Sequence, residues 1–226
     1  MILYKYMKID GIDLLKNKRC LFSKISELND SHEFRLNLNL TNELHKSPFE
    51  EIYSENSNKY GLISFSKNAN SILMSAHYSE NHTGFFIEIN SNLFFKSPDF
   101  PPNEIFEEVK YKDKLIEIND DMIHFYANGN SSVFDKAFKE MCITKSSEWI
   151  SENEYRVIIR IDPKKEPYMD IDPKCVNSII LGCNMKNEEV DRFKEAIQNS
   201  DFNKTPVYRA IPDKSSFSFA RKQILN

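Results

Sequence analysis

The sequence predicts an α+β fold, with a central mixed or antiparallel sheet flanked by helices. Residues 62–65 and 84–89 alternate apolar with polar side chains, which is typical of strands with one buried face. A third strand is indicated at residues 156–161 by the apolar run Val157-Ile158-Ile159. We expect these three segments to lie in one central sheet. Strands and helices are mixed without a regular βαβ rhythm, which favours α+β over α/β.

The length of 226 residues predicts a single domain over residues 1–226, because no repeat or convincing linker divides the chain. With 40% hydrophobic and 12% aromatic residues, the chain can bury a sizeable core. The net charge of −4 leaves no basic footprint, so general nucleic-acid binding is not expected. The first residues lack the pattern of a signal peptide, and no apolar run is long enough to span a membrane. A cytoplasmic protein is therefore expected, and the oligomeric state stays open.

The cysteines are distant from one another in the sequence, and no pair has C-x-x-C spacing. They are Cys20, Cys142, Cys175 and Cys183. Because metal sites need closely spaced Cys or His ligands, we expect reduced, mostly buried thiols and no metal.

The elements of the first half follow from local patterns and turn residues. Strands are predicted at residues 2–6 and 20–23, a short helix after Asp10 as N-cap, a helix-and-loop excursion at 42–54, and a helix at 71–79. A proline-bearing loop is expected at residues 94–103, because three prolines prevent a continuous helix or ladder.

The second half opens with a predicted strand at residues 104–111. Apolar residues at helical spacing then predict two helices within residues 119–145, separated at Asn128-Gly129-Asn130. The remaining predicted elements are a strand at residues 175–181, a helix at 186–198, and short strands at 205–211 and 217–219.

Polar side chains capable of chemistry are concentrated in two stretches. The first contains His77, Tyr78 and His82 in a short helix and turn. The second contains Glu152, Glu154 and Arg156 at the start of the third strand. We expect at least one of the two imidazoles to lie within a water-bridged distance of a glutamate. Along a strand Glu152 and Glu154 would share one face, so both carboxylates are expected to line one cavity.

A family resemblance rests on several short motifs, of which the His-Tyr segment is the most specific. The motifs are Leu3-Tyr4-Lys5-Tyr6, Leu28-Asn29-Asp30-x-x-Glu33, Ser64-Phe65-Ser66, Leu73-Met74-Ser75-Ala76-His77-Tyr78-x-x-x-His82-x-Gly84-Phe85, Trp149-x-x-Glu152-x-Glu154-Tyr155-Arg156 and residues 179–182. In these residues the chain resembles, along nearly its whole length, the bacterial domain-of-unknown-function family twenty-nine seventy-one. Ser75 and Ser31 stand where that family usually has Trp and Pro. The resemblance implies a cytosolic bacterial protein of defence or toxin-type loci, and it assigns no reaction.

The motifs are also similar, in their order, to those of the ADP-ribosyltransferase fold, which holds NAD between split sheets. This similarity implies NAD as a substrate, with Tyr4, Lys5 and Tyr6 on the first strand and Ser64 and Ser66 in the middle binding it. A glutamate of Glu152-x-Glu154 would orient the ribose hydroxyls and stabilise an oxocarbenium-like centre. The usual first-strand His or Arg is missing.

Two other functions are compatible with the same residues. A metal-independent nuclease or hydrolase would use His77 or His82 as general acid or base with Glu152 or Glu154. A non-catalytic sensor or interaction domain would use these groups as a buried network, with Arg156 as partner of Glu33 or Glu152. The role of the turn formed by Asn29, Asp30 and Glu33 stays open. In every case a cavity walled partly by Tyr4 or Tyr6 is expected.

Overall fold

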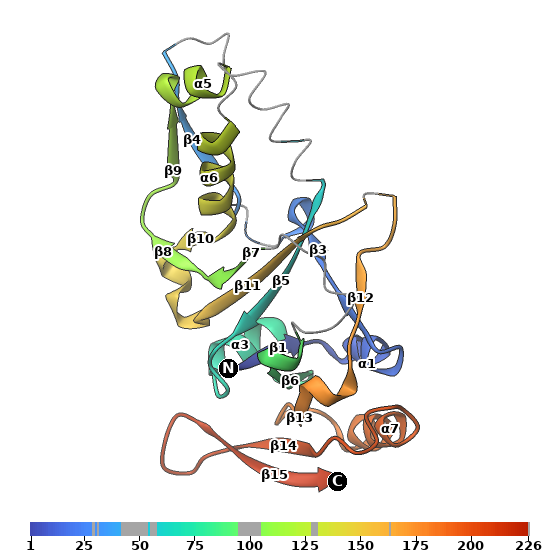
Figure 1. Cartoon of the computed structure of the whole chain (residues 1–226). Helices are drawn as coiled ribbons and strands as arrows, with labels where there is room; N and C mark the ends of the chain where they lie inside the picture. Colours follow the sequence, from blue (N-terminus) through green and yellow to red (C-terminus); the bar gives the residue numbers. More distant parts are fainter. Residues whose placement is uncertain are drawn as a thin grey trace.

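The computed structural model describes residues 1–28, 30, 32–41, 54, 58–94, 105–127, 131–162 and 164–225. Within these residues, a nine-stranded mixed sheet is accompanied by three two-stranded sheets (Figure 1). Among the described pairings of the large sheet, β13 and β14 run parallel and the others run antiparallel. The α+β prediction with a central mixed sheet flanked by helices is therefore confirmed.

The large sheet is built from strands distributed over the whole sequence. In sheet order they are β15 (Phe219–Leu225), β14 (Val207–Pro212), β13 (Val176–Leu181), β6 (Phe85–Asn90), β1 (Ile2–Met7), β5 (Tyr60–Ser66), β11 (Glu154–Arg160) and β7 (Ile105–Glu108), with β3 (Ser23–Lys24) paired to β5. The small sheets pair β10 (Thr144–Ser146) with β8 (Lys110–Lys112), β12 (Tyr168–Asp170) with β2 (Arg19–Leu21), and β4 (Leu36–Asn39) with β9 (Ile116–Asn119).

Short helices connect these strands. The α-helices are α1 (Ile12–Lys16), α3 (Ile72–Tyr78), α4 (Ser91–Phe94), α5 (Asp120–Ala127), α6 (Ser131–Cys142) and α7 (Asn187–Gln198). The 3₁₀ helices are η1 (Ile9–Gly11), η2 (Ile25–Glu27), η4 (Ser147–Glu152) and η5 (Pro173–Cys175).

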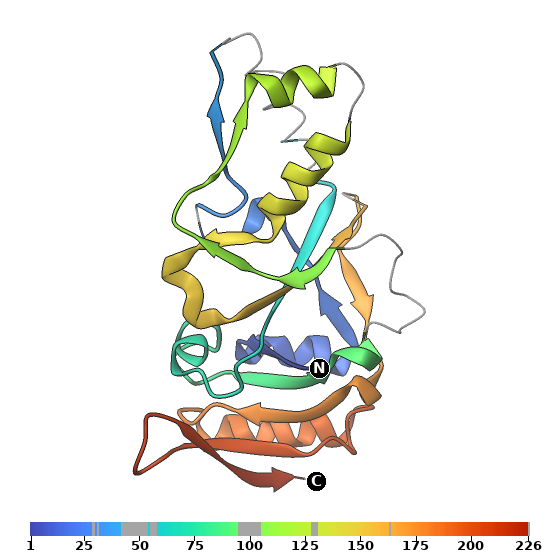
Figure 2. The same cartoon turned by 60° about the vertical axis from the view of Figure 1, so that its left-hand side comes forward.

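The large sheet consists of two halves that are joined at one point. β1 pairs with β6 along its whole length, and β5 pairs with β11 along its whole length. Between β1 and β5, in contrast, the register holds the single pair Tyr4 and Ser66. Figures 1 and 2 show β5 and β11 running steeply across the direction of β1 and β6. The two central strands therefore separate from each other away from this pair.

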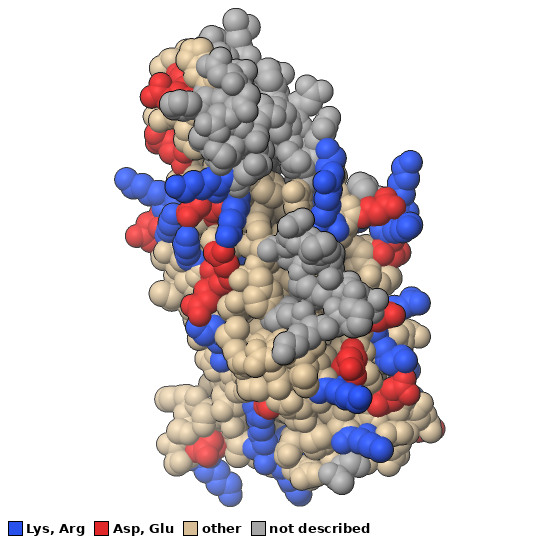
Figure 3. Space-filling view, in the orientation of Figure 1, with Lys and Arg blue, Asp and Glu red and all other residues tan. Residues whose placement is uncertain are grey.

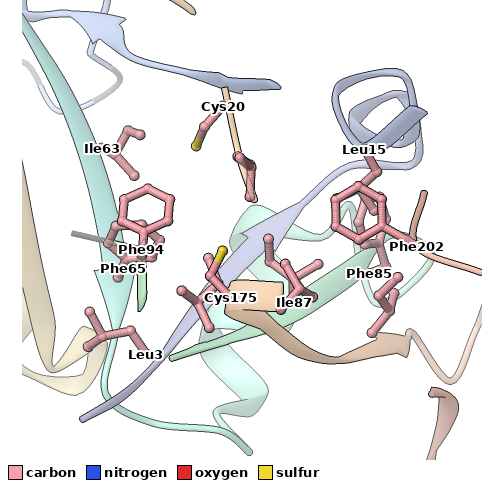
Figure 4. Close-up of a cluster of buried hydrophobic side chains, with 14 of the residues drawn as sticks. Leu3, Leu15, Cys20, Ile63, Phe65, Phe85, Ile87, Phe94, Cys175 and Phe202 are labelled. Atoms are coloured by element: carbon pink, nitrogen blue, oxygen red, sulfur yellow. The ribbon is translucent and has the colours of Figure 1, made fainter. Parts of the chain in front are cut away.

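One face of the sheet carries the main hydrophobic core, to which α1, α4 and α7 contribute Leu15, Phe94 and Phe193. Figure 4 shows side chains of β1, β5 and β6 meeting there with Cys20 and Cys175. On the opposite face α3 packs Met74 against the β1 half. On that face α6 packs Met141 against the β5 half. The boundary between β1 and β5, which we call the seam, therefore lies between α3 and α6.

The three predicted central strands are confirmed, since β5, β6 and β11 belong to the same sheet. Asp10 is not an N-cap, because it lies inside η1 and Gly11 precedes α1. The strand predicted at residues 104–111 is broken at Val109 into β7 and β8, which belong to different sheets. The last strand extends to Leu225, well beyond the predicted residues 217–219.

The predicted break between the two helices at residues 128–130 lies outside the described residues, as do most of the excursion at 42–54 and of the loop at 94–103. The helical prediction up to residue 145 was too long, because α6 ends at Cys142 and β10 follows. Within the described part of the chain, no helix combines the length and apolar character that a membrane crossing requires.

Candidate functional site

A cavity of about 280 Å³ opens at the seam where β1 and β5 separate. It is lined by Lys5, Tyr6, Ser23, Glu27, Leu28, Asp30, Glu33, Leu62, Ser64, Met74, Tyr78, Lys145, Trp149, Glu152 and Glu154. The wall residues come from β1, β3, β5, α3, β10, η4 and the start of β11. The cavity therefore depends on the tertiary fold and is not formed by any one local motif.

The floor of the site is an ion-pair network centred on the fully buried Arg156. Its Nε and Nη2 donate to the two carboxylate oxygens of Glu154 at 2.7 and 3.1 Å. Nη2 also donates to Glu33 Oε1 at 2.6 Å, and Nη1 donates to the Cys142 carbonyl oxygen at 2.9 Å. Such bidentate, charge-assisted hydrogen bonds fix the orientation of both partners.

Lys145 is the second buried cation of the network. Its Nζ lies 2.6 Å from Glu152 Oε2, 2.9 Å from Glu33 Oε1 and 3.5 Å from Glu154 Oε2. The same Nζ lies 4.8 Å from the centroid of the Trp149 ring, within the range of a cation–π contact. Lys145 thus connects three carboxylates and the aromatic wall of the cavity.

Glu152 has a different environment from Glu154, although the two are separated by a single residue. The Tyr78 hydroxyl donates to Glu152 Oε1 at 2.6 Å, and Lys145 binds the other oxygen. Both oxygens of Glu154 are instead engaged by Arg156. Because each carboxylate oxygen has more than one lone pair, Glu152 can still accept hydrogen bonds from a ligand in the cavity.

The backbone between these two glutamates is not a continuous strand. Glu152 ends η4 and Glu154 begins β11, while Asn153 has the left-handed conformation with φ 46°. Asn tolerates this region better than most residues do. Ser66 holds the turn by donating to the Glu152 carbonyl oxygen at 2.7 Å. Alternation of side chains along a strand is therefore the wrong reason for the two glutamates to share a face, because only Glu154 lies on the strand. Both glutamates do line the cavity.

Burial and neighbouring charges shift the pKa values of the site residues in opposite directions. Burial alone would raise the pKa of the Glu154 carboxyl, but Arg156, Lys145 and Ser64 together lower it to about 2. For Glu152, burial outweighs Lys145 and Tyr78, so its pKa is raised. For Lys145, burial favours a lower pKa, but Glu154, Glu33, Tyr78 and Glu152 raise it. The cluster therefore holds Lys145 charged and Glu154 ionised.

Lys5 and Tyr6 form the β1 wall of the cavity. Lys5 Nζ donates to the Ser64 carbonyl oxygen at 3.1 Å. Burial lowers the pKa of Lys5, opposed by Cys20 and Glu154. The Tyr6 hydroxyl donates to the Asn68 carbonyl oxygen at 2.9 Å, and its ring stacks on Phe86.

The structure brings together some of the sequence-predicted site residues. Tyr78, Glu152, Glu154 and Arg156 join one hydrogen-bonded network, and Lys5, Tyr6 and Ser64 line the same cavity. Ser66 instead supports the backbone of Glu152. Tyr4 packs against Phe86 and lies outside the residues that line the cavity.

The two histidines have other neighbours. The exposed His77 ring packs edge-to-face on Trp149, with 6.3 Å between ring centroids. The His82 ring lies 5.7 Å from that of Phe219. Among the described residues, neither imidazole makes a hydrogen bond or ion pair with Glu152 or Glu154. The hydroxyl that donates to Glu152 belongs to Tyr78.

Two central members of the network, Glu33 and Lys145, are not among the site residues that the sequence predicts. Glu33 is expected only as one of two alternative partners of Arg156, and the structure places the two in contact. Lys145 was assigned to the end of a helix, because the periodic apolar pattern continues through Met141 and hides the change to β10. The sequence offers one signal for Lys145, namely a lysine two residues after the apolar Ile143. A lysine in a buried segment needs an acidic partner, so this position indicates an ion pair.

A comparison with models of protein families gives a match. Residues 74–157 match the model of a family described as protein of unknown function (DUF2971). The chain resembles this family. The DUF2971 segment includes α3 with Tyr78 and the stretch from Lys145 to Arg156, but not the β1 and Ser64 walls of the cavity. No curated protein and no solved structure matches the chain significantly.

Proposed function

We propose that the chain binds NAD in the cavity at the seam and transfers its ADP-ribosyl group. The observation that supports this proposal is the separation of β1 from β5 beside Glu152. The two strands share one register pair, and the cavity between them is lined by Lys5, Ser64 and Glu152. The first-strand and Ser-x-Ser motifs thus lie on the neighbouring strands β1 and β5, and the Glu-x-Glu motif lies where η4 leads into the next strand, β11.

The composition of the cavity wall suits the nicotinamide riboside part of NAD. Tyr6, Tyr78 and Trp149 supply aromatic surface for a planar ring. The nicotinamide ring of NAD is cationic, and five acidic residues line the cavity against two lysines. Its volume of about 280 Å³ is just below the range of pockets that bury drug-sized ligands, so it suits one half of the dinucleotide.

Glu152 is the carboxylate that we assign to the reacting ribose. It would accept hydrogen bonds from ribose hydroxyls and stabilise the positive charge that develops at C1′. Tyr78 and Lys145 hold its two oxygens in fixed positions, which reduces the reorganisation needed during the reaction. Glu154 would act as a positioning residue, because it binds Arg156 and Lys145, and Lys145 in turn binds Glu152.

In this reaction the bond between ribose C1′ and the nicotinamide nitrogen breaks, and its electron pair remains on nicotinamide. The resulting oxocarbenium-like centre forms a new bond with an acceptor hydroxyl or with water. The acceptor loses one proton, so the products are nicotinamide, the ADP-ribosylated acceptor and H⁺. Lys5 stands on the strand where ADP-ribosyltransferases usually carry His or Arg, and its amine would contact the ligand in place of those side chains.

The test is NAD titration followed by melting temperature and nicotinamide release. At 100 times the dissociation constant, NAD should add about 2.7 kcal/mol and raise Tm by roughly 5–10 °C. Glu152→Gln should retain binding and lose at least about 100-fold in nicotinamide release. Glu140→Gln is the matched control, because Glu140 also binds lysines but does not line the cavity. No Tm shift at millimolar NAD would exclude the proposal.

The completeness of the ion-pair network favours a second candidate, a non-catalytic binding or sensor domain. Lys145, Arg156, Glu33 and Glu154 satisfy one another without any ligand. Buried networks of this kind can specify a fold without taking part in a reaction. A Tm shift with NAD but no release of nicotinamide by the wild-type protein would select this candidate. We do not propose the histidine-dependent hydrolase, because within the described part of the chain neither imidazole forms a hydrogen bond or ion pair with a glutamate that lines the cavity.

A further inference from the structure

A second cavity of about 490 Å³ adjoins the first. Asp30, Lys145 and Trp149 line both cavities, so the two spaces meet at these side chains. The other residues of the second cavity are His32, Phe34, Arg35, Lys112, Asp113, Lys114, Leu115, Ile116, Met141, Thr144, Ser146 and Glu148. The shared side chains place the two cavities next to each other, with Trp149 in the wall of both.

The two cavities differ in the charge of their walls. Five acidic and two basic residues line the first, whereas four basic and three acidic residues line the second. Figure 3 shows Lys and Arg gathered, with some Asp and Glu among them, over the flank where Figure 1 places β8 and β10. The chemical groups that suit the second cavity are therefore not those that suit the first.

Two cations of the second cavity are available to a ligand. Lys145 is engaged by three glutamates, and Lys112 shares Glu140 with Lys110. Arg35 and Lys114 are exposed, and among the described residues neither side chain makes a hydrogen bond or an ion pair. A guanidinium and an ammonium group that have no acceptor among the described residues are well suited to bind phosphate oxygens.

We infer that the second cavity binds the phosphate groups of the ligand whose ribose occupies the first, with Arg35 and Lys114 as phosphate-binding residues. The ligand class is then a nucleoside phosphate or dinucleotide, with its uncharged or cationic base at the acidic end. For the ribose end of the ligand, this inference rests on the proposed function. For the phosphate end, it rests on the residues that line the second cavity. Trp149 lies between the two ends and would contact the ligand at its middle.

The first experiment compares three ligands that differ in phosphate content: nicotinamide riboside, nicotinamide mononucleotide and NAD. The variant Arg35→Ala/Lys114→Ala should bind the two phosphorylated ligands about tenfold or more weakly, and the riboside with unchanged affinity. The matched control is Arg192→Ala/Lys204→Ala, which removes the same two charges from exposed positions outside both cavities. Equal losses for the riboside and the phosphorylated ligands, or equal losses in both variants, would overturn the inference.

A second probe separates this inference from the proposed function. Inorganic pyrophosphate alone should bind the wild-type protein and the control variant, and its affinity should fall about tenfold or more in Arg35→Ala/Lys114→Ala. If pyrophosphate behaves in this way but NAD does not bind, the phosphate site stands and the proposed function fails. If NAD binds with an affinity that the double variant does not change, the proposed function survives and the phosphate site is excluded. Absence of pyrophosphate binding by the wild-type protein would also overturn the phosphate site.

Discussion

Arg156 and Glu33 are separated by 123 residues in the chain, and their side chains meet through a hydrogen bond of 2.6 Å. Glu33 precedes Phe34, whose φ of 55° is unusual for a bulky residue and whose ring lies 5.4 Å from the Arg156 guanidinium carbon. The contact therefore ties the turn before β4 to the central strand β11. It makes the early turn, whose role the sequence left open, part of the site.

The first prediction concerns removal of this arginine. Arg156→Met should lower the free energy of unfolding by about 3–5 kcal/mol, because Glu33 and Glu154 would remain buried with less compensation. Urea denaturation should show the loss as a lower midpoint. Arg160→Met provides the control, because Arg160 is the exposed last residue of the same strand. A loss of equal size in both variants would contradict the assigned role of the network.

The second prediction concerns acid stability. The pKa of Glu154 is lowered from 4.5 to about 2, so its contribution to stability is fully present above pH 4.5. That contribution should decrease as the pH falls from about 4.5 toward about 2. Glu154→Gln should be less stable than wild type at pH 7, and the difference should shrink across this window. Chemical denaturation at several pH values measures it, with Glu140→Gln as a control at a more exposed ion pair.

The central strands could be predicted from the sequence because they are the most regular parts of the chain. Alternation in β5 and β6 and the apolar run in β11 report burial directly, so local pattern and tertiary structure agree there. β4 and β10 were missed because each is short and its partner is distant in the sequence. Pairing with a remote strand leaves no periodic signal in a segment of three or four residues.

The candidate site was partly predictable for a related reason. Glu152, Glu154 and Arg156 stand next to an apolar strand, where charged residues must find buried partners. The identity of those partners depends on how β10 and the turn at Glu33 approach β11, which no local pattern encodes. Tyr78 and the histidines belong to the same short segment, but the orientation of α3 directs Tyr78 toward Glu152. Choosing between these side chains required the tertiary structure.

The third prediction concerns Gly84, where the sequence suggested either a positive φ or close packing. Close packing is what the structure provides, since a Cβ atom at Gly84 would lie 2.2 Å from the Met7 carbonyl oxygen. Gly84→Val should therefore cost more than about 1 kcal/mol of stability. Gly11→Ala is a milder control, because its Cβ would meet side-chain atoms at 3.0 Å or more. Thermal or urea unfolding of both variants measures the difference, and an unchanged Gly84→Val protein would contradict the prediction.

The last prediction concerns Lys145, the cation shared by Glu33, Glu152 and Glu154. In Lys145→Met, Glu152 loses the charge that opposes the effect of burial, so its pKa, which burial already raises, should rise further. A carboxyl whose folded pKa lies above its unfolded value stabilises the protein at low pH, and this contribution is lost as the pH rises through the folded pKa. The variant should therefore be destabilised most at pH 8, and its deficit relative to wild type should decrease toward pH 5. Lys110→Met, at the exposed pair with Glu140, should show a deficit of at most about 1 kcal/mol. If the deficit of Lys145→Met were the same at pH 5 and pH 8, Lys145 would contribute by packing on Trp149 and not by compensating the three glutamates.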